Sequence, residues 1–417
     1  MMSVLRVARP MRYQYQRIAV LRIIRCQAYK SVIKSPVVES KSSLVLFKII
    51  KQQKYYFQTT PRRDISPIIA LILRPLIRIG AFLFGRAFRK WWAKQSVEER
   101  HKYSGWFSRK KQVFFGIMGA FLFGLVLYYG THIQTDPLTN RSRFIMFDKK
   151  QQAALSKIIF EMHLETFKDT LITKDHPTYK KLIKITEQIL NANKDLESIK
   201  DKQWTLTVVN SPLKNSYVLP GGNIFVFLGM LEIVENEDQL AVILSHEMAH
   251  ALLDHSIEQL SNGIILDLLL ALPIAIIWAF FPDLLAIIFQ FLGQTVIDLI
   301  HHLPYSRALE NEADQVGLIL CAKACVDVRE AVVFWGMMRV LTELKVEPQQ
   351  IPLWLSTHPD HGDREKTLNN QMEKALERRS YSGCPPLPSI DPRKRFYALT
   401  SKEHETIFKR RGIIPIS

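Results

Sequence analysis

Cysteine is scarce in this sequence of 417 residues, where it occurs only four times. Four cysteines are too few to hold together a disulfide-based fold in a chain of this length. Cys321 and Cys325 lie in the apolar run GLILCAKAC. Two interpretations stay open for them, a pair of small buried side chains or a redox pair. No histidine or further cysteine accompanies them, so they do not indicate a metal site.

Acidic residues are scarce in the first quarter of the chain. Residues 1–111 contain 25 lysines and arginines and four acidic residues, whereas the remainder contains 31 basic and 35 acidic residues. The net charge of +17 therefore belongs to the N-terminal segment. The part that can form a domain is slightly acidic, so we expect no nucleic-acid partner.

The N-terminal segment also lacks the unbroken apolar core of a secretory signal, because arginines interrupt every apolar run. Residues 1–38 contain eight basic residues and no acidic ones. This amphipathic, arginine-rich composition is typical of a mitochondrial transit peptide. We predict such a peptide over residues 1–60, with Cys26 lost when it is cleaved.

One segment has the length and composition of a membrane span. Residues 113–130 contain no charge and would form a helix of about 27 Å, close to the hydrocarbon thickness of about 30 Å. Arg109, Lys110 and Lys111 precede it, so the positive-inside rule places the N-terminal side in the matrix and the remainder in the intermembrane space. Within residues 61–111, Arg74 and Arg78 interrupt an apolar stretch and make a second span costly, which favours an interfacial helix that contacts the bilayer, including anionic lipids.

The sequence LSHEMAHALLDH contains His246, Glu247 and His250 in the order H-E-x-x-H. Residues four apart lie on the same face of a helix, so the two imidazoles can bind one metal ion. Zinc suits imidazole ligands and lowers the pKa of water to about 7. Glu247 is then the candidate catalytic base. The alternative is a solvated polar helix face, but the apolar run Leu240–Leu244 before the motif predicts a buried helix.

A third ligand is predicted 60 residues further on, in YSRALENEAD. Glu310 and Asp314 have helical i, i+4 spacing. We expect Glu310 to complete a site for one Zn²⁺ per chain, and Asp314 to accept the free N–H of a histidine ligand. Glu312 is a rival ligand that points about 160° away from Asp314. A charged solvent face that includes Arg307 is the remaining alternative.

With these motifs the sequence resembles the integral-membrane zinc metallopeptidases that include the CAAX prenyl proteases and the bacterial HtpX heat-shock proteases. Two further segments support the resemblance, Asn215–Gly222, similar to N-A-x-x-x-P-G-G, and Ser356–Arg364, similar to T-H-P-x-x-x-x-R. Together with the leader, they look most like the stress-activated metalloendopeptidase of the mitochondrial inner membrane whose activity overlaps that of the m-AAA protease.

The resemblance implies a mainly α zincin-like metallopeptidase domain with a small β-sheet, over residues 145–380. It also implies that an extended substrate pairs with the strand segment that contains Asn215, Pro220, Gly221 and Gly222. The implied substrates are inner-membrane proteins, among them the dynamin-like fusion GTPase, cleaved in quality control and under stress. His358 has two possible roles, a donor to the oxyanion of the reaction or a turn histidine before proline.

Two further segments complete the predicted organisation. Residues 263–303 are strongly apolar and separate the two metal-binding motifs. Both motifs must reach one ion, so this insert crosses the membrane twice or not at all; we favour a helical hairpin that dips into the membrane, with a spanning pair as the alternative. Residues 381–417 are rich in proline and predict an extended C-terminal tail.

The sequence therefore predicts a zinc endopeptidase of the mitochondrial inner membrane whose catalytic domain faces the intermembrane space, with membrane-protein substrates and a possible homo-oligomeric state. One rival is a prenyl-protein or general quality-control protease of another membrane, which a location in the endoplasmic reticulum would favour. Another is a non-catalytic membrane scaffold. The presence of every expected ligand disfavours the scaffold.

Overall fold

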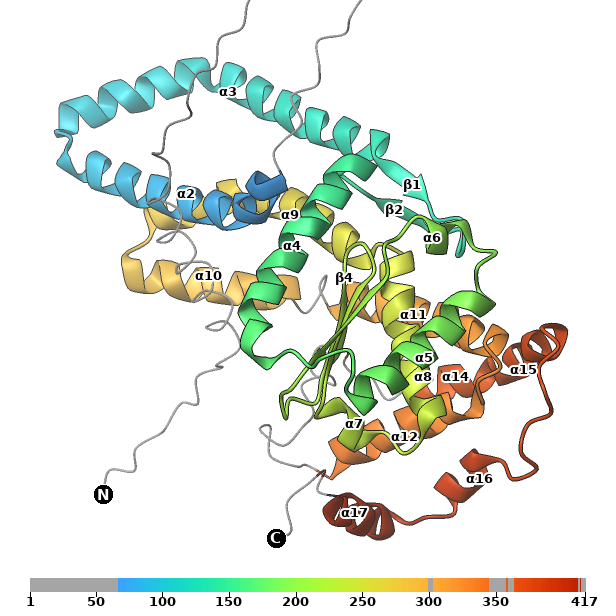
Figure 1. Cartoon of the computed structure of the whole chain (residues 1–417). Helices are drawn as coiled ribbons and strands as arrows, with labels where there is room; N and C mark the ends of the chain where they lie inside the picture. The colour runs from blue at the N-terminus through green and yellow to red at the C-terminus, as the bar shows by residue number, and fades with distance from the viewer. Residues whose placement is uncertain (1–66, 299–302, 345–357, 359–363, 412, 414–417) are drawn as a thin grey trace, which may run out of the picture. The chain divides into compact units, whose positions relative to one another are not determined.

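The computed structural model describes residues 67–298, 303–344, 358, 364–411 and 413. The chain divides into two units, Met1–Arg62 and Arg63–Ser417, and the described residues all belong to the second. The predicted transit peptide, residues 1–60, therefore lies outside them. The second unit is mainly helical with two small sheets, which confirms the predicted fold class (Figure 1).

Long helices occupy both the N-terminal part of this unit and its centre. The helices, in chain order, are α2 (Pro67–Lys94), α3 (Val97–Thr131), α4 (Lys149–Phe167), α5 (Pro177–Ala192), α6 (Glu197–Lys200), α7 (Met230–Ile233), α8 (Glu237–Leu252), α9 (His255–Phe280), α10 (Asp283–Ile297), α11 (Leu303–Lys323), α12 (Arg329–Glu343), α14 (Arg364–Asn370), α15 (Met372–Tyr381), α16 (Pro392–Tyr397) and α17 (Ser401–Arg410).

The larger sheet has three strands, β3 (Thr205–Val209), β4 (Ser216–Leu219) and β5 (Asn223–Phe227), in the order β3-β5-β4. β3 runs parallel to β5, and β4 runs antiparallel to it. Gly221 and Gly222 form the β4–β5 turn with φ of +94° and +96°, which a residue with a Cβ rarely adopts. The predicted strand segment Asn215–Gly222 contains β4 and this turn.

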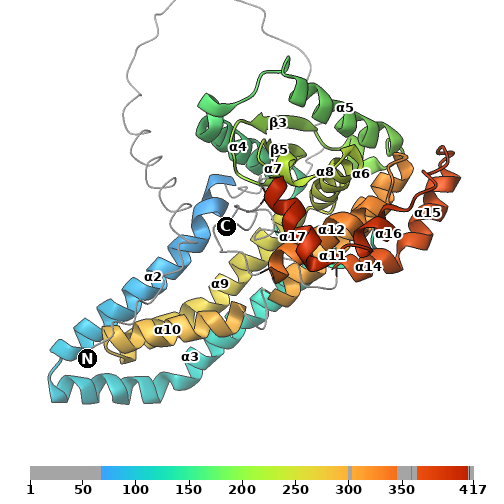
Figure 2. The ribbon, with the colours of Figure 1, turned by 90° about the horizontal axis from the view of Figure 1, so that it is seen from below.

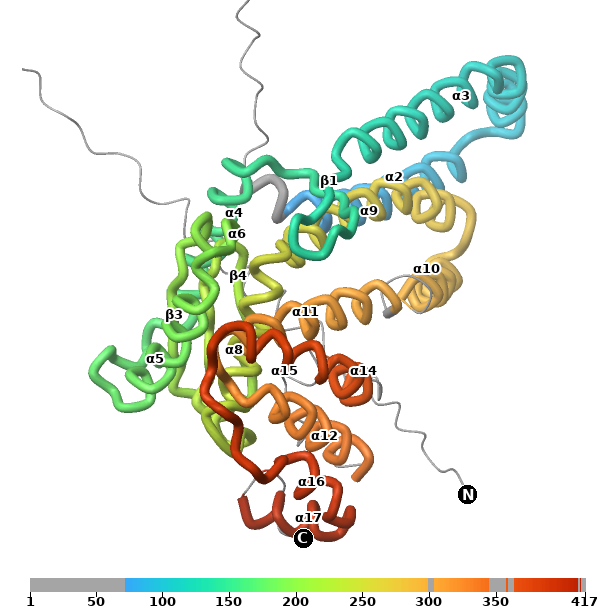
Figure 3. Tube along the Cα trace, turned by 90° about the vertical axis from the view of Figure 1, so that its right-hand side faces the viewer, coloured from blue at the N-terminus to red at the C-terminus, as the bar shows by residue number. Residues whose placement is uncertain are grey.

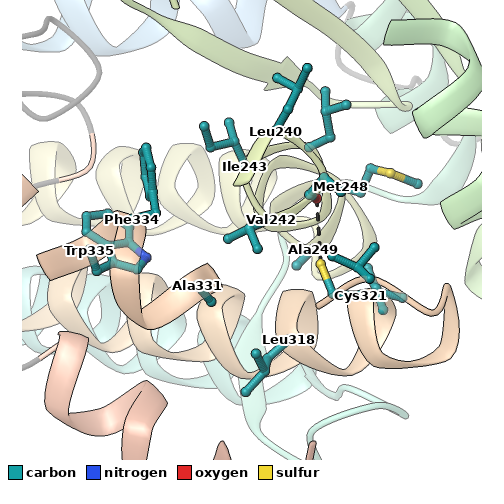
Figure 4. Packing of buried hydrophobic residues seen from close by; sticks show 14 of the residues in the cluster. Leu240, Val242, Ile243, Met248, Ala249, Leu318, Cys321, Ala331, Phe334 and Trp335 are labelled. Carbon is teal, nitrogen blue, oxygen red and sulfur yellow. Dashed lines mark hydrogen bonds between the residues drawn. The ribbon is translucent and has the colours of Figure 1, made fainter. Parts of the chain in front are cut away.

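Helix α8 lies at the centre of the main core, where it packs against α5, α11, α12 and β4. Every residue from Gln239 to Leu252 is buried, so no face of this part of the helix is exposed to solvent. Figure 4 shows its apolar side chains surrounded by side chains from α11 and α12, among them Leu318 and Trp335. A buried helix of this kind can hold a polar side chain only where another group satisfies it.

Helix α2 packs along α9, and the two run side by side in Figures 2 and 3. Arg74 and Arg78 both pair with Asp267 of α9, at 2.8 and 2.7 Å, and the Asp267 side chain is fully buried. The two arginines that disfavoured a second membrane helix at the sequence level are therefore neutralised by a residue about 190 positions away. These pairs lower the cost of burying the two arginines, and the interfacial position of α2 stays a prediction.

The hydrophobic insert forms the helical hairpin α9–α10. Among the described residues, α3 and α9 are the helices long and apolar enough to cross a membrane. At 26 residues, α9 is about 39 Å long, whereas α10 with 15 residues is about 22 Å. The predicted helical hairpin is present, and its position relative to the membrane stays a prediction. None of the side chains of α3 is buried, as a helix surrounded by lipid requires.

The C-terminal region differs from the predicted extended tail. Asp391 and Thr400 cap the short helices α16 and α17. Phe396 and Phe408 on these helices are buried in the main core, and α16 packs against α12. The density of prolines suggested an extended chain, but Pro392 occupies the first turn of α16, where proline is compatible with a helix.

The two cysteines of the apolar run have different roles: Cys321 is the small buried side chain that one interpretation predicted, and Cys325 pairs with a cysteine outside the run. Cys325 forms a disulfide with Cys384, 59 residues away. Cys321 is a free, buried thiol, and burial raises its pKa to about 12, which keeps it unreactive at neutral pH. Cys325 lies in a left-handed turn just after α11, with φ of +62°, so its side chain does not follow the helical i, i+4 direction of Cys321.

We predict that Asp267→Asn lowers the unfolding free energy of the full chain in detergent by about 1–3 kcal/mol, because two arginines lose their charged partner. Asp283→Asn is the matched control, since Asp283 also pairs with two arginines, Arg86 and Arg89, but its side chain is 44% exposed. The control should cost less. Thermal unfolding measures both. Equal melting temperatures for the two variants would contradict a stabilising role for the Asp267 pairs.

Candidate metal centre

The first motif of the site lies on α8. Asn236 caps this helix by accepting a hydrogen bond from the backbone N–H of Gln239, and Glu237 and Asp238 lie in its first turn, where acidic side chains are favourable. The helix continues without a break through His246 and His250, which lie one turn apart. Both histidines are buried, as the apolar run before them predicted.

The second motif lies on α11, which packs against α8. Glu310 and Asp314 are buried on the side that faces His246. Gly317 permits the close approach of the two helices, because a Cβ there would lie 3.1 Å from the backbone nitrogen and Cα of His246. The predicted convergence of residues 60 positions apart is therefore built by helix packing.

Three predicted ligands converge in the buried space between α8 and α11. The Nε2 atoms of His246 and His250 are 3.0 Å apart. The Glu310 carboxylate lies 3.3 Å from Nε2 of His246 and 3.6 Å from Nε2 of His250. One donor atom from each of these residues, together with one from His358, lies within 4.8 Å of all the others.

This donor set fits a metal ion. Nδ1 of His246 lies 3.0 Å from Asp314 Oδ1, so the ring proton belongs on Nδ1 and the Nε2 lone pair points into the cluster. Imidazole lone pairs and a carboxylate that face one another repel unless a cation lies between them. Three nitrogens and one carboxylate are donors that zinc accepts. The residues therefore fit the predicted ion.

Asp314 occupies the position expected for a residue that orients a ligand. Besides His246, it accepts hydrogen bonds from Arg364 at 2.7 and 2.6 Å. The guanidinium of Arg364 also lies 3.4 Å from the ring centre of Trp335, a cation–π contact that fixes its plane. Burial alone would raise the pKa of Asp314, but the charge of Arg364 and the bond from His246 lower it. The carboxylate stays ionised.

Glu310 is also kept ionised. Burial would raise its pKa, but the imidazoles of His358 and His250 hold that pKa well below its ordinary value. Arg364 donates a further hydrogen bond to it at 3.0 Å. Arg364, the last residue of the segment similar to T-H-P-x-x-x-x-R, therefore pairs with two carboxylates of the site.

Glu247 and His358 lie beside the three predicted ligands. Nε2 of His358 is 3.4 Å from Glu247 Oε1, and its Nδ1 is 3.1 Å from Glu310. His358 therefore belongs to the cluster rather than only to a turn. Its ring can either bind a metal ion or donate a hydrogen bond. The neighbouring residues 351–357 and 359–363 of its predicted motif lie outside the described ones.

Glu312, the rival ligand, is outside the cluster. It points away from Glu310 and lies 3.2 Å from Nε2 of His255, a buried histidine whose Nδ1 is 2.8 Å from Nδ1 of His250. Burial lowers the pKa of His255 to about 4 and keeps its ring neutral at physiological pH. His255 was not among the predicted site residues, although its place five residues after His250 was a signal that could have found it.

The predicted substrate segment contains β4 and the turn that follows it. β4 is an edge strand of its sheet and packs against α8. Asn215 is buried just before β4, and its Oδ1 has no hydrogen-bond partner within the described residues. Pro220, Gly221 and Gly222 form the turn at the other end of the strand, where the Pro220 carbonyl accepts a hydrogen bond from Ser156. The predicted strand thus packs against the helix that carries His246 and His250.

Comparison with known proteins is consistent with this centre. A family model described as peptidase family M48 matches residues 180–372. The mitochondrial metalloendopeptidase OMA1 of Danio rerio is 38% identical over 352 residues, which cover 84% of this chain and 73% of that protein. The human protein of this name is 36% identical over 372 residues, 85% of this chain and 69% of its own length. That of Saccharomyces cerevisiae is 30% identical over 277 residues, 64% and 76% respectively.

Proposed function

The chain belongs to peptidase family M48 and is a metalloendopeptidase, and from this premise we propose that it uses one zinc ion to cleave membrane proteins at the mitochondrial inner membrane. The observation that carries the proposal is the convergence of His246, His250 and Glu310 in a buried cluster beside Glu247. Apolar helices long enough to cross a membrane belong to the same unit of the chain, which favours membrane-bound substrates.

We assign the metal to His246, His250 and Glu310, with Asp314 as the residue that orients His246. When bound, the ion would supply Lewis-acid chemistry that polarises a peptide carbonyl and lowers the pKa of a water molecule to near neutral. The protein's own groups then move the protons. Glu247 takes a proton from the attacking water and delivers it to the leaving amine as the peptide bond breaks.

His358 is assigned to the carbonyl oxygen of the substrate. Its ring lies between Glu247 and Glu310, so a carbonyl near the ion would be within reach of an imidazole N–H. A positioned donor there stabilises the negative charge that develops on the oxygen. The closeness of His358 to both histidine ligands also allows it to bind the ion while no substrate is present.

The substrate is assigned to the edge of β4. An extended peptide that adds a strand there would lie along α8, with its backbone near Glu247. Backbone pairing gives affinity without demanding a particular sequence. It suits a protease for several membrane proteins in quality control and stress-activated processing, and the family resemblance adds the dynamin-like fusion GTPase as a substrate.

The location is proposed from the leader and from the relatives. The basic segment 1–60 is typical of mitochondrial import, and the relatives from fish and human are named as mitochondrial. The basic residues before the apolar part of α3 favour a matrix location for that end of the helix. The catalytic domain would then face the intermembrane space.

We predict that Glu247→Gln retains zinc but loses cleavage of a membrane-protein substrate by about 10²–10⁴-fold, because the amide cannot accept a proton. Zinc content by mass spectrometry and cleavage by gel assay measure the two effects. Glu161→Gln, on the exposed surface of α4, is the matched control and should cleave normally. Undiminished cleavage by the Glu247 variant would exclude this mechanism. If the wild-type protein does not cleave the substrate, the non-catalytic membrane scaffold is favoured instead.

We predict that a C-terminal tag is protected from added protease in intact mitochondria and is digested once the outer membrane is ruptured, because the catalytic domain faces the intermembrane space. A matrix protein serves as the control that stays protected. Protection of the tag after rupture would place the domain in the matrix and contradict the proposed topology.

A further inference from the structure

A left-handed residue separates the metal-binding helix from the membrane-associated hairpin. Asp254 has φ of +49° and lies between α8 and α9. On an uninterrupted helix, residue 255 would point about 140° away from residue 250. The break turns the chain back, so that Nδ1 of His255 comes to 2.8 Å from Nδ1 of His250. Asp254 is held in this place by Lys202, 2.7 Å away.

A path of hydrogen bonds runs from His250 through His255 to Glu312, and all of its bonds point in the same direction. His250 directs Nε2 toward Glu310, so its proton belongs on Nδ1 and is donated to Nδ1 of His255. His255 then carries its own proton on Nε2 and donates it to the Glu312 carboxylate. Each ring has one donor and one acceptor, and the path satisfies both.

Glu312 is itself fixed by the segment that follows α3. Thr139 and Arg141 donate to its two oxygens, and Arg141 also forms a two-bond ion pair with Glu258 at 2.7 and 2.6 Å. Arg141 lies between strands β1 (Ile133–Thr135) and β2 (Ser142–Phe144), which form a hairpin directly after the candidate membrane helix.

We propose that His255 is a positioning residue that sets the tautomer and ring orientation of His250, and that Arg141 secures it through Glu312. The inference rests on the proposed metal site. Each histidine ligand then has its own carboxylate on α11, since Asp314 orients His246 directly and Glu312 orients His250 through His255. It also connects the segment after α3 to a ligand of the ion.

A purely structural role for His255 is the alternative, because the side chain is buried. Two variants separate the roles. His255→Phe keeps most of the ring volume and removes both hydrogen bonds. His255→Asn keeps an acceptor close to the place of Nδ1, so it can still receive the proton of His250 but cannot reach Glu312. Packing alone predicts that Phe is tolerated better than Asn, whereas positioning predicts the reverse.

The experiment measures the zinc affinity of the full chain in detergent by competition with a chromophoric chelator. We expect His255→Phe to weaken zinc binding about 10–100-fold, as loss of a residue that orients a ligand does, with partial recovery in His255→Asn. Asp314→Asn is the positive control. His404→Phe, which replaces a buried histidine on α17, is the matched negative control and should bind zinc as the wild type does.

A double-mutant cycle tests the role of Arg141. We expect Arg141→Gln to weaken zinc binding in the wild-type background and to have little further effect in the His255→Phe background, because both changes break one path. Additive effects would overturn the role of Arg141. Wild-type affinity in His255→Phe would overturn the inference as a whole while leaving the proposed function intact. Failure of the wild-type protein to bind zinc would instead overturn the proposed function.

Discussion

The packing of α8 against α11 is the constraint on which the rest of the site depends. It brings two imidazoles and a carboxylate from distant parts of the chain into one buried space, at a separation that Gly317 allows. Such a cluster is unfavourable without a cation and without partners for the outer ring nitrogens. Asp314 with Arg364 on one side, and His255 with Glu312 on the other, supply those partners.

The same principle of paired charge explains the packing of the apolar helix α9 against α2. Asp267 is buried in α9 and pairs with two arginines of α2. The paired charges stabilise the two helices together, whereas an unpaired charge on either helix would cost free energy to bury. Because α9 begins at His255, directly after the metal-binding helix, the apolar hairpin and the active site share one continuous stretch of chain.

The sequence predicted the parts of the site that depend on local periodicity. Helical spacing was sufficient to place His246 and His250 on one face and to pair Glu310 with Asp314, whereas the packing of α8 against α11 brings the two motifs together. Prediction from local periodicity failed for His255, because the left-handed backbone of Asp254 changes the direction of the chain and brings His255 next to His250. It also failed for pairs far apart in sequence, such as Arg74 with Asp267 and Cys325 with Cys384, because no local pattern marks them.

We propose that one zinc ion joins α8 to α11. Diffraction from the zinc-loaded protein, with anomalous data at the zinc absorption edge, would locate this ion. We expect one strong anomalous peak at about 2.0–2.2 Å from Nε2 of His246, Nε2 of His250 and a carboxylate oxygen of Glu310. A peak elsewhere, or an ion held by the two imidazoles while Glu310 points away, would contradict it.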